Sequence, residues 1–182
     1  LRVGAQARLG GRRGDAVNAA PDSNRERWAL PLLLVGALLL LLFDLGRRSV
    51  WTDEGSTWTA ASAPLRELVR LCAQKDASPP LFYLLTAIAI RIRDDETHLR
   101  LVAALAAVAL VWLTYRLARR FLPRNPSRVA ALLTAISPYQ LMFAQEARTY
   151  MLVACFTVAA FVLFLRAADS GRPRAWVPYV II

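Results

Sequence analysis

Two short polar motifs hold the side chains of this sequence that are best suited to chemistry. The first reads WTDEGS at 51–56, and the second reads QEARTY at 145–150. On a helix, Asp53 and Glu54 of the first motif would point about 100 degrees apart, so each would serve a different partner. One can act as a general base while the other holds a metal, a cation or a helix end. The alternative is that Thr52 or Asp53 only caps the following helix.

The second motif places charges between two apolar runs, where charges are costly unless they are paired or used. Arg148 is a candidate for binding an anionic group, because its planar fork matches phosphate oxygens. Glu146 and Arg148 could also form an ordinary interfacial ion pair. Arg100 is a weaker candidate of the same kind and could merely snorkel toward the headgroups.

The elements that must position these motifs are transmembrane helices. Of the 182 residues, 57% are hydrophobic, and they form long runs separated by short arginine-rich stretches. Since about 20 apolar residues cross a bilayer, the runs predict an all-α polytopic membrane protein. Its domain is expected at 28–182, with spans near 28–45, 99–118, 128–143, 150–166 and 176–182.

The two ends of the chain have a different character. Residues 1–27 lack apolar periodicity and predict a disordered cytoplasmic tail. The chain begins at Leu1 and ends inside an apolar run. We therefore expect it to be the amino-terminal part of a longer protein.

The arginines indicate which side of the membrane each motif occupies. The apolar run Pro79–Ile92 is short for a span, and if it crossed, five arginines between Arg116 and Arg128 would lie outside. That arrangement would violate the positive-inside rule. If the run stays at the interface, those arginines are cytoplasmic and both polar motifs are extracytoplasmic. The outer loop then covers 46–98 and carries interfacial helices, among them an amphipathic segment near Thr57–Ala73.

Composition also excludes several other classes of protein. The formal charge of +10 could indicate a nucleic acid partner, but the arginines flank apolar runs and do not line an aromatic-interleaved face. The cysteines, Cys72 and Cys155, form neither a disulfide framework nor a CxxC metal motif. We therefore expect membrane lipid as a partner and no nucleic acid.

An ordered set of short motifs runs from Ser49 to Asp169. It comprises the Asp-Glu pair after the first span, SPPLFYLL at 78–85, Arg100-Leu101 at the start of a span, and Ser137-Pro138 followed by QEARTY at 145–150. Together these motifs resemble the GT-C glycosyltransferases. They are most similar to the bacterial relatives of protein O-mannosyltransferases and of lipid A aminoarabinose transferase.

The resemblance implies a GT-C type helical bundle and a multi-pass enzyme of the plasma (inner) membrane, in the cell envelope. Such an enzyme moves a hexosyl or pentosyl group from a polyprenyl-phosphate-linked donor to an acceptor hydroxyl at the outer face, with inversion. The acceptor could be a lipid, a glycan or a protein. The sequence requires no cofactor, although a divalent metal could take part.

The resemblance also implies roles for individual residues. Asp53 matches the catalytic aspartate, and Glu54 matches its acidic neighbour and is the candidate metal ligand. The implied substrate-binding positions are Pro79, Pro80, Tyr83, Arg100, Gln145, Glu146, Arg148 and Tyr150. Family members often carry His or Lys where this chain has Ser78, which leaves open the group that contacts the donor phosphate from this loop.

The alternative class is a polytopic transporter or lipid flippase. Such proteins place ionisable residues or broken helices near the bilayer midplane. In this sequence the ionisable residues instead gather at the ends of the expected spans, which favours chemistry at the membrane surface.

Overall fold

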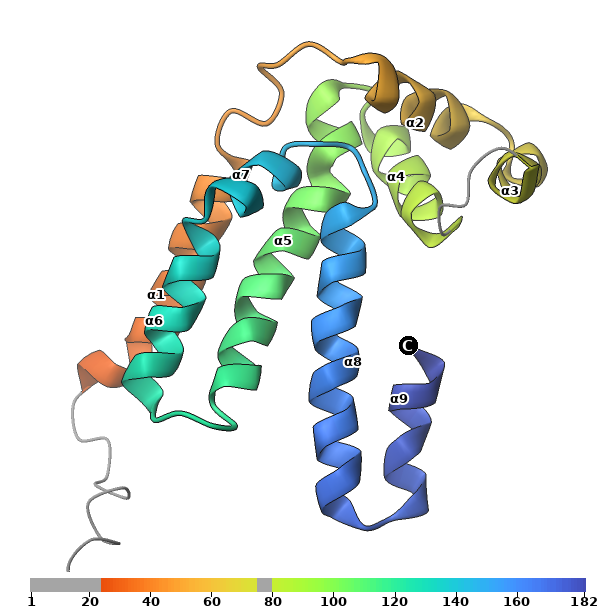
Figure 1. The fold of residues 1–182 in the computed structure, drawn as a ribbon. Coiled ribbons are helices and arrows are strands. Elements are labelled where there is room, and N and C mark those ends of the chain that lie inside the picture. The colour runs from red at the N-terminus through yellow and green to blue at the C-terminus, as the bar shows by residue number, and fades with distance from the viewer. Residues whose placement is uncertain (1–23, 75–79) are drawn as a thin grey trace, which may run out of the picture.

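The computed structural model describes residues 24–74 and 80–182, and every regular element within these ranges is a helix (Figure 1). The predicted tail lies outside the described residues except for 24–27, which begin the first helix. The all-α class is therefore confirmed for the described part of the chain. The elements are α1 (Asn24–Leu42), α2 (Thr52–Ser62), α3 (Leu65–Gln74), α4 (Pro80–Ile92), α5 (Glu96–Ala118), α6 (Arg124–Ala135), α7 (Pro138–Ala144), α8 (Tyr150–Ser170), the 3-10 helix η2 (Pro173–Trp176) and α9 (Val177–Ile181).

Helix α5 is central and packs against α1, α4, α6, α7 and α8. Its buried face is rich in alanine, at Ala103, Ala104, Ala106 and Ala107. Small side chains let helix backbones approach closely, which favours association where lipid replaces water. The carbonyl of Ala107 also accepts a hydrogen bond of 2.7 Å from Nε2 of Gln140 on α7. Close packing around α5 therefore holds the bundle together.

Among the described residues, two helices are long and apolar enough to cross a membrane, judged by length and composition. They are α5, with a mean hydropathy of 1.9, and α8, with 2.3. They coincide with the spans expected near 99–118 and 150–166. The apolar parts of α1 and α4 are shorter. The crossings expected near 28–45, 128–143 and 176–182 stay predictions.

Prolines divide two stretches that the apolar pattern treats as single segments. In 128–143, α6 ends at Ala135 and α7 begins at Pro138. In 57–73, α2 ends at Ser62 and α3 begins at Leu65, after Pro64. Proline has no N–H to donate and pushes the residue before it out of the helical region. Each stretch is therefore two helices, not one.

The helices of the 46–98 segment gather at the end of the bundle where α5 and α8 begin (Figure 1). There α2 packs on α4, and α4 packs on α5. On α3, Leu68 is buried whereas Leu65 and Val69 are exposed. An amphipathic helix with exposed apolar residues suits a membrane surface. Both polar motifs lie at this end of the molecule.

Candidate active site

A buried ion pair connects α2 with α5. Glu54 lies in the first turn of α2 and Arg100 lies near the start of α5, and their side chains are 1% and 2% exposed. Nε of Arg100 donates to Oε1 of Glu54 at 2.8 Å, and Nη2 donates to Oε2 at 2.6 Å. Two charge-assisted bonds between the same two groups give this pair both strength and a fixed geometry.

The other N–H groups of Arg100 hold the backbone between α1 and α2. Nη1 donates to the carbonyls of Leu45 at 2.9 Å and Arg48 at 2.8 Å, and Nη2 donates to the carbonyl of Ser49 at 3.4 Å. A guanidinium has five N–H donors, so each donor of Arg100 has an acceptor within the protein. The geometry therefore favours a positioning role for Arg100 over the contact with the sugar donor that the resemblance implies.

Glu54 also reaches the second polar motif. The backbone N–H of Ala147 donates to Oε1 of Glu54 at 2.8 Å. Burial by itself would raise the pKa of Glu54. The hydrogen bonds from Arg100 and Ala147, together with the attraction of the guanidinium, outweigh burial and hold the pKa below its usual value. The ionised carboxylate thus ties α2 to the segment at 145–149.

This tie brings together the two residues expected to do the chemistry. Asp53 and Arg148 are the chain neighbours of Glu54 and Ala147. Oδ2 of Asp53 lies 3.8 Å from Nη2 of Arg148, and the two side chains are 47% and 26% exposed. This distance allows electrostatic attraction but exceeds a hydrogen bond. Neither group therefore uses the other as a hydrogen-bond partner, and both face solvent in part.

The rest of the second motif surrounds Arg148. Burial and the neighbouring carboxylates raise the pKa of Glu146. The guanidinium of Arg148 lies 5.7 Å from the ring centroid of Tyr150, within range of a cation–π contact. Nε2 of Gln145 donates to the carbonyl of Phe43 at 3.2 Å. The motif is thus anchored to the chain that follows α1 as well as to α2.

The remaining predicted site residues belong to the SPPLFYLL motif. Pro79 lies outside the described residues, and Pro80 begins α4 at an exposed position. Tyr83 is buried in the same apolar cluster as Ala147. Helix α4 therefore supports the segment that carries Arg148.

Metal ligands do not gather at this site. Within 24–74 and 80–182, no three His, Cys, Asp or Glu side chains lie close enough together to hold a metal ion. Both oxygens of Glu54, the candidate ligand, already accept hydrogen bonds from Arg100 and Ala147. A metal at Glu54 stays a prediction.

Sequence reasoning missed the partners that hold the site together. One signal was present, because an arginine near the start of an apolar helix is costly unless it is paired. That signal does not name Glu54 as the partner. The contacts made by the backbone N–H of Ala147 and by the carbonyls after α1 could not be predicted from residue types, because nearly every residue has these backbone groups.

Comparison with known proteins agrees with these features. Residues 77–182 match the family described as dolichyl-phosphate-mannose-protein mannosyltransferase. The matched region is more than half of the chain and includes Arg100 and the motif at 145–150, whereas Asp53 and Glu54 precede it. No curated protein and no solved structure matches the chain.

The match and the two helices able to cross a membrane define a class, the membrane glycosyltransferases. The chain belongs to the dolichyl-phosphate-mannose-protein mannosyltransferase family, within the GT-C superfamily. The resemblance drawn from the motifs is confirmed. Family membership also favours a transferase over the transporter that the sequence left as an alternative.

Proposed function

We propose that this protein transfers a sugar from a polyprenyl-phosphate donor to an acceptor hydroxyl at the extracytoplasmic face of the plasma membrane, with inversion at the anomeric carbon. Asp53 is the general base, and Arg148 binds the donor phosphate. The observation that carries the proposal is the 3.8 Å approach of Oδ2 of Asp53 to Nη2 of Arg148. A carboxylate able to accept a proton thus lies near a guanidinium at one end of the membrane helices.

Asp53 suits the role of base by position and by chemistry. A neutral hydroxyl is a poor nucleophile, so a carboxylate within hydrogen-bond reach must accept its proton during attack. In the proposed step the acceptor oxygen bonds to the anomeric carbon as its proton passes to Asp53. The bond from that carbon to the phosphate oxygen breaks, and its electron pair leaves with the lipid phosphate.

Arg148 suits the role of phosphate clamp. The leaving phosphate gains negative charge in the transition state, and a fixed cation lowers the energy of that charge. A guanidinium keeps its charge throughout the working pH range and offers paired N–H groups to phosphate oxygens. The ring of Tyr150, 5.7 Å from the guanidinium, helps to orient it.

Substrate binding must separate these two side chains. Inversion requires the nucleophile and the leaving group to lie on opposite sides of the anomeric carbon, and a gap of 3.8 Å between Asp53 and Arg148 leaves no room for a sugar ring. Both side chains are partly exposed, so each can rotate. We expect the donor phosphate to draw Arg148 away from Asp53, which opens the space that the sugar fills.

Glu54 and Arg100 act through their neighbours in this scheme. Their bonds fix the start of α2, the chain after α1 and the N–H of Ala147 with respect to one another. Asp53 and Arg148 are each one residue away from that fixed point. Catalysis requires the positions of reacting groups to be precise, and a rigid backbone around them provides this precision.

The test is transfer of radiolabelled sugar from polyprenyl-phosphate donors in membranes that contain the intact protein. Asp53→Asn is nearly isosteric and cannot act as the base, so transfer should fall by roughly 100- to 10,000-fold. The control is Asp44→Asn, which removes the same charge from a carboxylate after α1 that pairs with Arg47. The control should transfer at the wild-type rate.

Two results would contradict the proposal. Wild-type transfer by an Asp53→Asn protein inserted at the normal level would show that Asp53 is not the base. Failure of the wild-type protein with mannosyl, glucosyl and aminoarabinosyl polyprenyl phosphates would count against this class of donor.

A further inference from the structure

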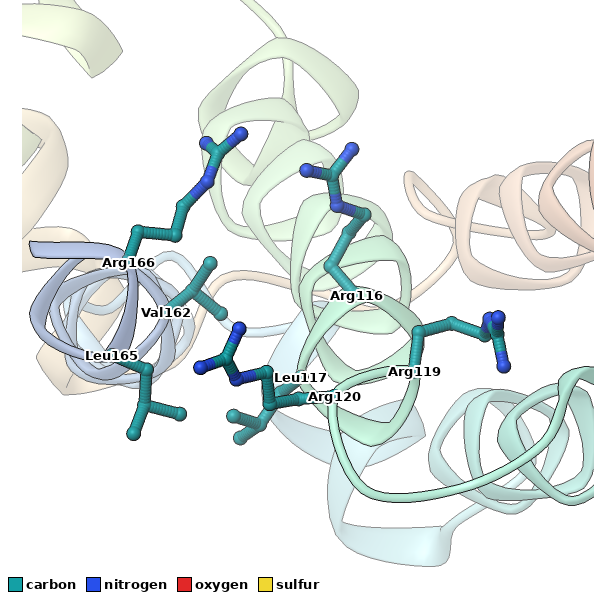
Figure 2. A pocket seen from close by; sticks show the side chains of 7 residues that line it. All are labelled: Arg116, Leu117, Arg119, Arg120, Val162, Leu165 and Arg166. Carbon is teal, nitrogen blue, oxygen red and sulfur yellow. The ribbon is translucent and has the colours of Figure 1, made fainter. Parts of the chain in front are cut away.

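A basic pocket lies between α5 and α8 (Figure 2), near the ends of these helices that are remote from α2 in Figure 1. Its volume is about 230 Å³, and its lining combines four arginines with Leu117, Val162 and Leu165. The arginines are Arg116, Arg119, Arg120 and Arg166. At 1.5 Å per residue, Arg116 lies about 24 Å along α5 from Arg100. The pocket is therefore separate from the candidate active site.

Two of the four arginines have partners within the protein. Arg120 forms a salt bridge with Asp169 at the end of α8. Nη1 of Arg119 donates to the carbonyl of Leu122 at 2.7 Å, and Figure 2 shows the Arg119 side chain pointing away from the other three. Arg120 therefore already has a counter-charge, and Arg119 is directed away from the other cations of the pocket.

Arg116 and Arg166 differ from Arg120, which has a carboxylate partner, and from Arg119, which points away from the other cations. Neither forms a salt bridge within 24–74 and 80–182. In Figure 2 their side chains extend in the same direction from neighbouring helices. The guanidinium of Arg116 lies 5.3 Å from the ring centroid of Trp112, which helps to fix its direction. Cations gathered at one site repel one another, and an anion bound between them would relieve that repulsion.

We propose that this pocket binds the phosphate headgroup of an anionic phospholipid. Each guanidinium presents a fork that matches phosphate oxygens. The aliphatic side chains of Leu117, Val162 and Leu165 supply a surface for the glycerol and the upper acyl chains. Inorganic phosphate would leave that apolar surface unused, so the lining favours a lipid over the free ion.

The depth of the pocket agrees with a lipid ligand. Helix α5 has 23 residues, about 34 Å at 1.5 Å per residue, close to the roughly 30 Å of a hydrocarbon layer. Arg116 is in the last turn of α5, at the level of the headgroups. Basic pockets between membrane helices are well suited to anionic headgroups at this depth.

The test measures lipid binding by the intact protein, purified in uncharged detergent, with native mass spectrometry. Dioctanoyl phosphatidic acid and dioctanoyl phosphatidylcholine serve as probes, and inorganic phosphate is the third arm. The test variant is Arg116→Gln with Arg166→Gln. The control variant is Arg172→Gln with Arg174→Gln, which removes the same charge from exposed positions between α8 and α9.

The wild type should bind phosphatidic acid and not phosphatidylcholine. The pocket variant should bind phosphatidic acid roughly tenfold or more weakly than the control variant, because only the pocket variant loses direct charge-assisted hydrogen bonds. If the glutamine variant does not fold, Arg116→Lys with Arg166→Lys keeps the charge and should still bind more weakly than the control variant.

Other outcomes would overturn the inference. Equal losses in the pocket and control variants would show only general attraction between basic residues and acidic lipid. Equal binding of the two lipids would remove the need for an anionic headgroup. Displacement of phosphatidic acid by inorganic phosphate at similar concentration would make the site one for the free ion.

Discussion

Glu54→Gln is a sharp perturbation of the buried ion pair because it keeps the shape of the side chain and removes its charge. The amide oxygen can replace one carboxylate oxygen, but the NH₂ group then faces an N–H of Arg100. The guanidinium stays buried without a counter-charge. Breaking a buried pair in this way costs about 3–5 kcal/mol. The loss is large beside the roughly 5–15 kcal/mol that stabilises a typical domain.

The measurement is thermal unfolding of the purified protein in detergent, with sugar transfer followed in parallel. Transfer should fall with stability, because Glu54 also fixes the N–H of Ala147, next to Arg148, the proposed phosphate clamp. The matched control is Glu67→Gln on α3. Glu67 forms an exposed pair with Arg70 at 3.8 Å, and removing such a pair should cost only about 0–1 kcal/mol.

A double variant sharpens the test. Arg100→Gln alone should also be strongly destabilising, because Glu54 then loses its charge partner. If the two side chains act as one unit, the loss in the double variant should fall short of the sum of the single losses by about 0.5–3 kcal/mol. Two results would refute the reasoning. One is a double variant whose loss of stability equals the sum of the two single losses. The other is a Glu54→Gln protein with the same melting temperature as Glu67→Gln.

Three further predictions concern pH, phosphate recognition and packing. The folded pKa of Glu54 is lowered from 4.5, so its carboxylate stabilises the fold above that value and this contribution is lost as the pH falls below it. Wild-type thermal stability should therefore fall more steeply in acid than that of Glu54→Gln, and matching pH profiles would disprove this. Arg148→Lys keeps the charge but loses the planar guanidinium, so the KM for the donor should rise. The control Arg47→Lys, at an exposed position, should leave the KM unchanged. An unchanged KM in Arg148→Lys would show that Arg148 does not bind the donor phosphate. Ala107→Leu overpacks the buried face of α5 and should lower the free energy of unfolding by about 1–3 kcal/mol, measured by thermal unfolding. The control Ala168→Leu, at an exposed position, should change it little. Equal melting temperatures of the two variants would contradict the close packing around Ala107.

Much of the helical architecture could be predicted from the sequence. The apolar runs at 99–118 and 150–166 became α5 and α8, because a helix is the one local structure that satisfies its own backbone in lipid. The sequence also indicated the two polar motifs and the family, since both depend on residue types in order along the chain. The helix breaks before Leu65 and Pro138 follow from local chemistry too, because proline acts through its own missing N–H.

The sequence by itself therefore determined the helices, the membrane setting and the residue types available for catalysis, since each depends on contacts near in the chain. Only the tertiary structure decided which of those residues lie together. Packing of α2 and α4 against the start of α5 pairs Glu54 with Arg100 and with the N–H of Ala147, and so places Asp53 beside Arg148. Packing of α8 on α5 likewise turns arginines from distant segments into one pocket. Charge and spacing along a chain do not specify such pairings, because they arise from the close packing of elements that are remote in sequence.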